Sequence, residues 1–156
     1  MPTKIKDYQF VPDTDPTLGS NSDEKTPSQK AVRTFVTNRF LWHTLFFSVE
    51  GNLAVGEKPL RIYVPCNMTI DHVFIAVGTA PQGNSIIVDV NKNGTTIFTS
   101  GSNRPTIVAG SNTGSGVPDI TTLTTNDYLT FDIDQVGSTV AGADLTVHVR
   151  CKQYLS

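Results

Sequence analysis

Cysteine, long apolar runs and an excess of charge of either sign are all scarce in this chain. Two cysteines in 156 residues are too few for the disulfide framework of a small secreted domain. The formal net charge of -2 and the lack of a basic stripe provide no attraction for nucleic acid or anionic lipid. No apolar run approaches the roughly 20 residues that a membrane-spanning helix needs. We therefore expect neither nucleic acid nor a membrane as a partner.

The two cysteines, Cys66 and Cys151, leave two interpretations open. They could form a disulfide, or both could be small buried thiols. The N-terminus lacks the apolar region of a secretory signal, so we expect synthesis in a cytoplasm, where thiols stay reduced. Cys151 also continues an apolar alternation that favours a buried thiol, made of Leu145, Val147 and Val149.

The composition favours strands and turns. Apolar residues make up only 38% of the chain, whereas glycine, proline, serine, threonine and asparagine are abundant, as in an all-β domain with many turns. The chain divides into three predicted segments: an extended arm over residues 1–25, a short helix over residues 26–42 and a β-domain over residues 43–156.

The arm is polar, and its few apolar side chains follow no sustained period. Alone it should be extended or disordered. Tyr8 and Phe10 are its main apolar residues, too few to form a core. They either dock onto another protein or belong to an unstructured terminus.

The helix is predicted from its start signals and its apolar spacing. Thr26 is a suitable N-cap, Pro27 suits the first helical position, and Gln29 completes a capping-box pattern. Four apolar residues follow at helical spacing: Val32, Phe35, Val36 and Phe40. A helix this short is marginal alone in water. Its apolar face would pack either on the β-domain or, as a stalk, on copies of itself around a symmetry axis.

From Trp42 onward the apolar period changes from helical to two, which predicts strands. Asn91-Lys92-Asn93-Gly94 predicts a hairpin, because Asn and Gly tolerate positive φ, whereas residues 110–118 are predicted to be a loop. Most strands have one apolar and one polar face, so we expect an antiparallel β-sandwich of about seven to nine strands. A jelly roll is the natural candidate, and an immunoglobulin-like topology stays open.

The segment from Asp23 to Val36 resembles a stretch common in bacteriophage tail-fibre and related virion fibre proteins. In that family an Asp precedes a Pro-[Ser/Thr]-Gln-Lys-Ala-Val core, which is followed by an aromatic residue and Val. This chain has Pro27-Ser28-Gln29-Lys30-Ala31-Val32 and then Phe35-Val36. Glu24 and Thr26 depart from the family pattern at surface or cap positions.

A second run, Asn126 to Gly137 followed by Gly142 to Val147, looks like the end of small β-domains in the same virion proteins. Together the resemblances imply a homotrimeric virion fibre protein, made in the host cytoplasm. The arm would attach to another virion protein, the helix would form a stalk, and the β-sandwich would be a head for host attachment, with surface glycan as the expected ligand.

Three alternatives to this role stay open. The same build fits a capsid head fibre or decoration protein, or an adaptor whose β-domain binds another virion protein. A free carbohydrate-binding module is another alternative, although it would have no use for the arm. An enzyme such as a depolymerase has the least support.

Candidate catalytic and metal-binding residues are scattered. The histidines lie on different predicted elements without the spacing of a zinc site: His43, His72 and His148. Asp132 and Asp134 share a strand face near Asp127, but Asp-x-Asp is more typical of strand ends and turns than of calcium ligands or a glycosidase pair. Gly110 to Gly116 lacks the Lys-Ser/Thr of a phosphate loop. We expect no catalytic residue, metal or cofactor.

Exposed aromatic residues are the remaining lead, because sugar rings stack on them. Trp42 is expected to pack at the junction of helix and strand, and Tyr63 is predicted to be exposed opposite an apolar strand face. His148 is predicted to share a polar face with Arg150 and Lys152, toward solvent or a neighbouring subunit. These residues do not define a ligand site.

Overall fold

The computed structural model describes residues 12–13, 26–27, 31–32, 34 and 40–154 of the chain. It divides the chain into two compact units. The first comprises Met1–Leu41 with Tyr154–Ser156, and the second comprises Trp42–Gln153.

In the first unit, β1 (Pro12–Asp13) pairs in parallel with β2 (Thr26–Pro27), and residues 31, 32 and 34 are helical. The prediction of a helix over residues 26–42 is therefore wrong at both ends. Thr26 and Pro27 are extended, and Phe40, Leu41 and Trp42 begin the strand β3. Aromatic residues in a run favour a pleated strand, which explains the error at the second end.

The second unit consists of strands and turns, as its sequence predicted. The longer strands are β3 (Phe40–Asn52), β4 (Gly56–Tyr63), β5 (Met68–Thr79), β6 (Ile86–Lys92), β11 (Tyr128–Gln135) and β12 (Ala143–Tyr154). The shorter elements are β7 (Thr95–Thr96), the 3-10 turn η1 (Gly101–Asn103), β8 (Thr106–Ile107), β9 (Thr113–Gly116) and β10 (Thr122–Leu123). The sheet has 10 strands, more than predicted, because the shortest are too brief to show alternation.

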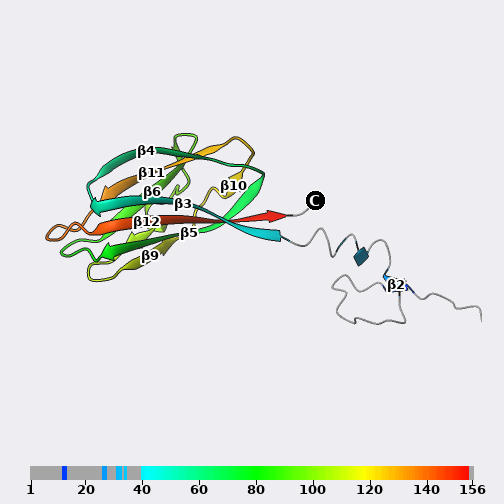
Figure 1. Ribbon diagram of the computed structural model, residues 1–156, viewed down its shortest axis with the longest axis horizontal. Helices are drawn as coiled ribbons and strands as arrows, with labels where there is room; N and C mark the ends of the chain where they lie inside the picture. The colour runs from blue at the N-terminus through cyan, green and yellow to red at the C-terminus, as the bar shows by residue number, and fades with distance from the viewer. Residues whose placement is uncertain (1–11, 14–25, 28–30, 33, 35–39, 155–156) are drawn as a thin grey trace, which may run out of the picture. The chain divides into compact units, whose positions relative to one another are not determined.

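These strands form an antiparallel sandwich with the strand order of a jelly roll (Figure 1). One layer has the order β3-β12-β5-β9 and the other the order β4-β11-β6-β8. Connections between consecutive strands cross from one layer to the other, as in a jelly roll. They include those from β3 to β4, from β5 to β6, from β8 to β9 and from β11 to β12. The fold class predicted from the sequence is confirmed, and the strand order selects the jelly roll over the immunoglobulin-like topology.

The two layers are joined where β8 pairs with β9, between Thr106 and Ser115. The backbones approach so closely here that a Cβ on Gly114 would lie 2.1 Å from the Thr106 carbonyl oxygen. The prediction that residues 110–118 form only a loop is therefore wrong, because Thr113–Gly116 pairs with β5. Glycine in this segment permits close approach of two strands, so the strand shows no apolar alternation.

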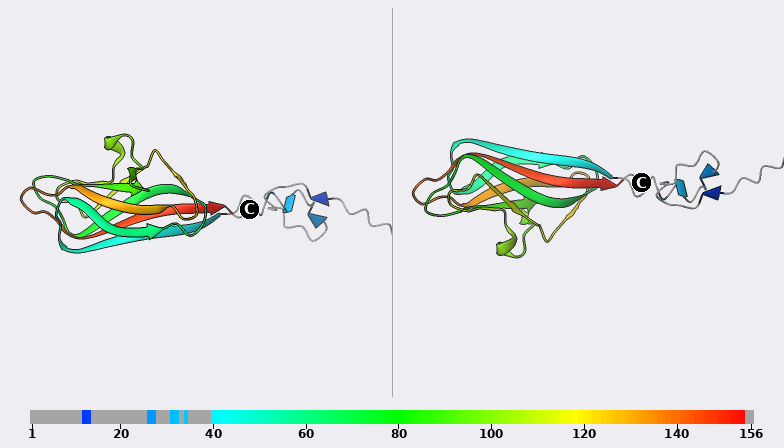
Figure 2. Two further views of the ribbon diagram at one scale, coloured as in Figure 1. Left: turned by 90° about the horizontal axis from the view of Figure 1, so that it is seen from above. Right: turned by 90° about the horizontal axis from the view of Figure 1, so that it is seen from below.

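The hairpin predicted at residues 91–94 is confirmed. Asn91 pairs with Thr96, and the turn residues Asn93 and Gly94 have φ angles of 52° and 83°. The chain beyond this hairpin, which includes η1, projects on one side of the sandwich before β8 begins (Figure 2).

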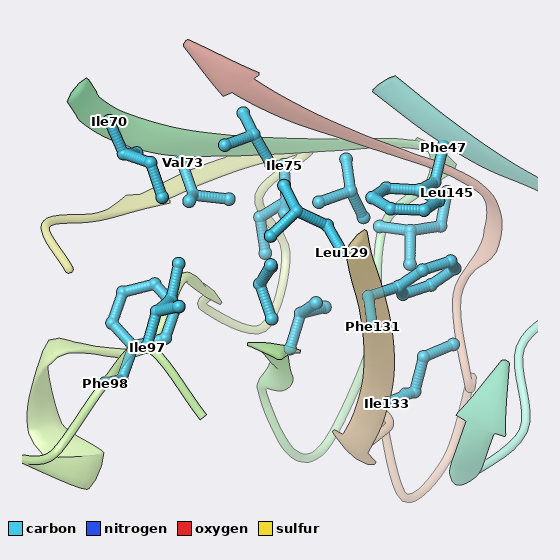
Figure 3. Close-up of a cluster of buried hydrophobic side chains, with 14 of the residues drawn as sticks. Phe47, Ile70, Val73, Ile75, Ile97, Phe98, Leu129, Phe131, Ile133 and Leu145 are labelled. Atoms are coloured by element: carbon cyan, nitrogen blue, oxygen red, sulfur yellow. The ribbon is translucent and has the colours of Figure 1, made fainter. Parts of the chain in front are cut away.

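The hydrophobic core lies between the two layers (Figure 3). Phe47 of β3 and Phe131 of β11 come from opposite layers, and their ring centroids are 4.9 Å apart. Burying one such side chain stabilises a fold by roughly 1.5–3 kcal/mol, so this pair contributes strongly to holding the layers together. Cys151 is also fully buried, and both it and the half-buried Cys66 are free thiols.

The end strand β4 departs from its predicted pattern. Val64, which directly follows β4, is buried, but Leu60 within the strand is 54% exposed. The register of β4 against β11 shifts between Leu129 and Phe131, which turns this part of β4 away from the core.

Candidate functional site

Aromatic and basic side chains gather on the outer face of the layer β3-β12-β5-β9. We call this surface the basic aromatic face and define it by Trp42, Phe46, Asp71, His72, Phe74, His148, Arg150 and Lys152. Strand alternation explains it, because the intervening residues of β5 and β12, such as Val73 and Val149, are buried in the core. Large apolar side chains are unusually open to solvent here: Trp42 is 49%, Phe46 62% and Phe74 42% exposed.

A β-bulge places Asp71 on this face. In the ladder between β5 and β12, His72 pairs with Arg150 and Ile70 pairs with Cys151, so Asp71 is an extra residue without a partner in the register. A bulge re-aims side chains. The side chains of Asp71 and His72, although adjacent in sequence, therefore meet on the same face of the sheet.

Asp71 is the centre of a charged network. Its Oδ1 lies 2.6 Å from Lys152 Nζ, and its Oδ2 accepts hydrogen bonds from Arg150 Nη2 at 2.6 Å and Nε at 3.1 Å. His72 Nδ1 also contacts Oδ2. The Lys152 ammonium, followed by the Arg150 guanidinium, lowers the pKa of Asp71 far below its usual range. The side chains of Arg150 and Lys152 thus share one carboxylate.

The same cations lie over aromatic rings. The Arg150 guanidinium is 4.4 Å from the Trp42 ring centroid and 5.7 Å from that of Phe74, and Lys152 Nζ is 5.0 Å from that of Trp42. The His72 and Phe74 rings meet edge to face, with their ring centroids 4.0 Å apart. Cation–π contacts of this kind hold the guanidinium in place while leaving it at the surface.

An open hollow of about 290 Å³ lies in the basic aromatic face. Its walls include Thr44, Phe74, Ala76, Thr113, His148 and Arg150, from all strands of the layer. The hollow is largely apolar inside, and Arg150 and two threonines are among its lining residues. Such a combination of apolar surface and a few polar groups is typical of small-molecule sites.

The outer face of the other layer is acidic, and three of its carboxylates are bound within the fold. Asp89 is buried, with one oxygen 2.8 Å from Arg104 Nη2 and the other accepting a hydrogen bond from Thr96. Asp132 accepts a hydrogen bond from Asn91, and Asp134 pairs with Arg104 at 3.0 Å. Burial raises the pKa of Asp134 despite the opposing effect of Arg104.

Asp127 belongs to a turn. It accepts hydrogen bonds from the Thr124 backbone N–H and from the Asn93 side chain. Asp127 therefore has the turn role that the sequence favoured, and Asp134 lies near the end of β11, whereas Asp132 lies in the middle of that strand.

The histidines lie apart. His43 Nε2 is 2.8 Å from Gln153 Oε1, His72 contacts Asp71, and His148 stacks on Phe46 with ring centroids 6.3 Å apart. Across residues 40–154 and the few described before them, no three His, Cys, Asp or Glu side chains form a group that could hold a metal ion. No helix among the same residues is long and apolar enough to cross a membrane.

Four of the residues predicted for anchoring or oligomer contact lie outside the described residues: Tyr8, Phe10, Phe35 and Val36. Val32 is helical and 42% exposed. Phe40 lies in β3 and not on a helix, so it does not share a helical face with Val32.

The sequence foresaw part of the basic aromatic face. The polar alternation of His148, Arg150 and Lys152 on β12 is confirmed, and Tyr63 on β4 is exposed as predicted. The role of Asp71 was missed. Its signal was the pair of consecutive polar residues Asp71-His72, which interrupts the apolar alternation of β5 and indicates a bulge. The chain matches no known protein family, and no curated protein matches it.

Proposed function

We propose that this chain is a structural, non-enzymatic component of a bacteriophage virion. In this proposal it is a homotrimeric fibre protein that attaches to the particle through residues 1–25 and presents its jelly-roll domain to the host surface. The observation that carries the proposal is the segment Pro27 to Val32, which resembles the virion-fibre segment and precedes a compact β-unit in the sequence.

Three structural features support the proposal. The chain forms two units, which provides one region for attachment and another for presentation. Val32 is 42% exposed in the single chain, which leaves apolar surface for contact between copies. The basic aromatic face favours attachment to a host ligand over capsid decoration, because decoration needs no such surface. Trimeric presentation would strengthen weak individual contacts through avidity.

Deletion of residues 1–22 tests the anchor. We expect the shortened chain to form trimers of unchanged stoichiometry in light scattering and to be missing from purified particles. A matched variant, Tyr63→Ala on the β-domain, should be incorporated normally. If the shortened chain is incorporated as well as the full chain, the arm is not the anchor.

Replacement of Val32, Phe35 and Val36 by Ser tests the stalk. Polar side chains remove the apolar area that would be buried between copies, so the oligomer mass in light scattering should fall toward that of a single chain. Val108→Ser, at a valine that is 59% exposed in the β-domain, is the control and should leave the mass unchanged. An unchanged mass in the triple variant would exclude these residues from the trimer contact.

A further inference from the structure

The hollow in the basic aromatic face combines an apolar wall with a cation, Arg150, that has a hydrogen-bond donor left over. Phe74 and Ala76 supply apolar walls, and Thr44, Thr113 and Arg150 also line the hollow. Arg150 donates to Asp71 through Nε and Nη2. Among the described residues, no hydrogen bond engages its third nitrogen, Nη1. A donor of this kind at a hollow is suited to an anionic acceptor.

The charges of this face also favour an anion. Arg150 and Lys152 both pair with Asp71, and of the two only Arg150 lines the hollow. Asp71 remains ionised over the whole physiological range, because its pKa is strongly lowered by those same cations. Asp71 therefore holds the Arg150 guanidinium at the hollow in its charged, hydrogen-bonded position.

The shape favours a sugar ring. At about 290 Å³ the hollow is at the small end of the range for ligand sites, and it is open to solvent rather than enclosed. The Phe74 ring and the imidazole of His148 offer flat surfaces for the C–H groups of a saccharide, and the largely apolar lining suits such contact.

We propose that this hollow binds an acidic saccharide, a sugar unit whose carboxylate is held by Arg150 while its ring packs against Phe74 and His148. The inference rests on the proposed role in host attachment and specifies the ligand class and the site. Each site binds weakly, as expected for a shallow hollow, and several copies on one particle provide the strength of attachment.

The test compares two sugars that differ by a carboxylate. The full-length protein is titrated with methyl glucuronide and with methyl glucoside, and backbone amide shifts are followed by NMR. We expect saturable shifts confined to strands of this layer, with the glucoside binding about tenfold more weakly or worse, because it lacks one charge-assisted hydrogen bond. Equal binding of both sugars, or no saturable shift on this face, would overturn the proposal.

Arg150→Met removes the charge and keeps most of the side-chain length. It should weaken glucuronide binding about tenfold or more, whereas the matched change Arg61→Met should not. Arg61 is also an exposed arginine over an aromatic ring, 4.5 Å from the Tyr128 centroid, but it lies on β4 in the other layer. Equal losses in the two variants would refute a specific site.

Phe74→Ala gives a second variant that leaves the Asp71 network in place. Its side chain faces outward, so the fold should persist, and both sugars should bind more weakly.

Acetate is titrated separately, and binding of acetate as strong as that of glucuronide would reduce the site to a generic anion site. If the chain is incorporated into particles but does not bind glucuronide, this inference is refuted and the virion assignment is not. Glucuronide binding by a chain missing from particles would support this inference and refute the virion assignment.

Discussion

Asp71 illustrates how one residue can organise a surface. Its carboxylate orients Arg150 and Lys152, and these cations lie over the Trp42 ring. Asp71 can reach both because the bulge in β5 turns its side chain toward them. Without this carboxylate, two like charges would lie at neighbouring positions of one strand face, and the ion pairs that offset their repulsion would be lost.

Asp71→Asn should make the free energy of unfolding change less as the pH falls into the acid range. The folded pKa of Asp71 is lowered, so its ionised form stabilises the fold above the unfolded pKa of about 3.9, and this contribution is lost as pH falls through the folded value. Near neutral pH the variant should unfold with about 1–2 kcal/mol less free energy, since the network is partly solvated. In urea unfolding, the difference in free energy of unfolding between the variant and the wild type should become smaller in acid.

Asp134→Asn provides the comparison with opposite sign. Burial raises the folded pKa of Asp134, so the folded state holds the proton more tightly than the unfolded state. The contribution of Asp134 to stability is then largest in acid and is lost as pH rises through the folded pKa. Relative to this variant, the free energy of unfolding of the wild type should therefore be higher in acid than near neutral pH. Parallel trends for the two variants would contradict both assignments.

Cys151 should be chemically inert in the folded protein. Burial raises the pKa of its thiol to about 12, so almost no reactive thiolate forms near neutral pH. Iodoacetamide followed by mass spectrometry should modify the half-buried Cys66 first, and Cys151 only after denaturation. A disulfide-linked Cys66–Cys151 peptide in a non-reducing digest would contradict the free thiols.

At the scale of elements, predictions succeeded where alternation was long and failed where it was interrupted. The strand β12 shows one apolar and one polar face over its whole length, and β11 buries Leu129, Phe131 and Ile133 at every second position. These patterns identify a sandwich directly. They do not identify which strands are neighbours, because the jelly-roll order depends on pairings between residues far apart in the chain.

The errors have local causes. The capping signals at Thr26 and Pro27 are short-range preferences, and pairing of β2 with β1 prevails over them. In β9 the inward positions are glycines because another strand passes beneath them, so no apolar side chain marks the strand. At Asp71 the bulge shifts the alternation by one residue. The candidate site was hidden mainly by this last feature, since its aromatic and basic residues come from separate strands.

Gly114→Ala should destabilise the join between the layers. Its Cβ would overlap the Thr106 carbonyl oxygen, which belongs to the backbone and can move only with its strand. We expect a loss of about 1–3 kcal/mol in urea unfolding, typical of overpacking. Gly101→Ala in η1 is the control, because its Cβ would meet nothing within 4 Å, and it should change stability by less than about 0.5 kcal/mol. Equal stability of the two variants would contradict the close approach.

At the scale of the molecule, the β-domain separates two surfaces of different character. One layer has exposed aromatic and basic side chains, and the other has carboxylates that are bound by Arg104 and Asn91. The core between them depends on residues from both layers, such as Phe47 and Phe131. Outward-facing residues can therefore vary without loss of the fold, which suits a domain proposed to contact a host surface.

The central claim is that the chain is part of a virion, with its arm at the particle and its β-domain outward. Gold-labelled antibodies against the β-domain and against residues 1–22, applied to intact particles, test it most directly. We predict labelling of the particle by the first antibody at a fixed location and none by the second, because the arm is occupied; both should bind the free protein. A location on the tail supports host attachment, and one on the capsid supports decoration instead. Particles left unlabelled by the β-domain antibody would contradict the account.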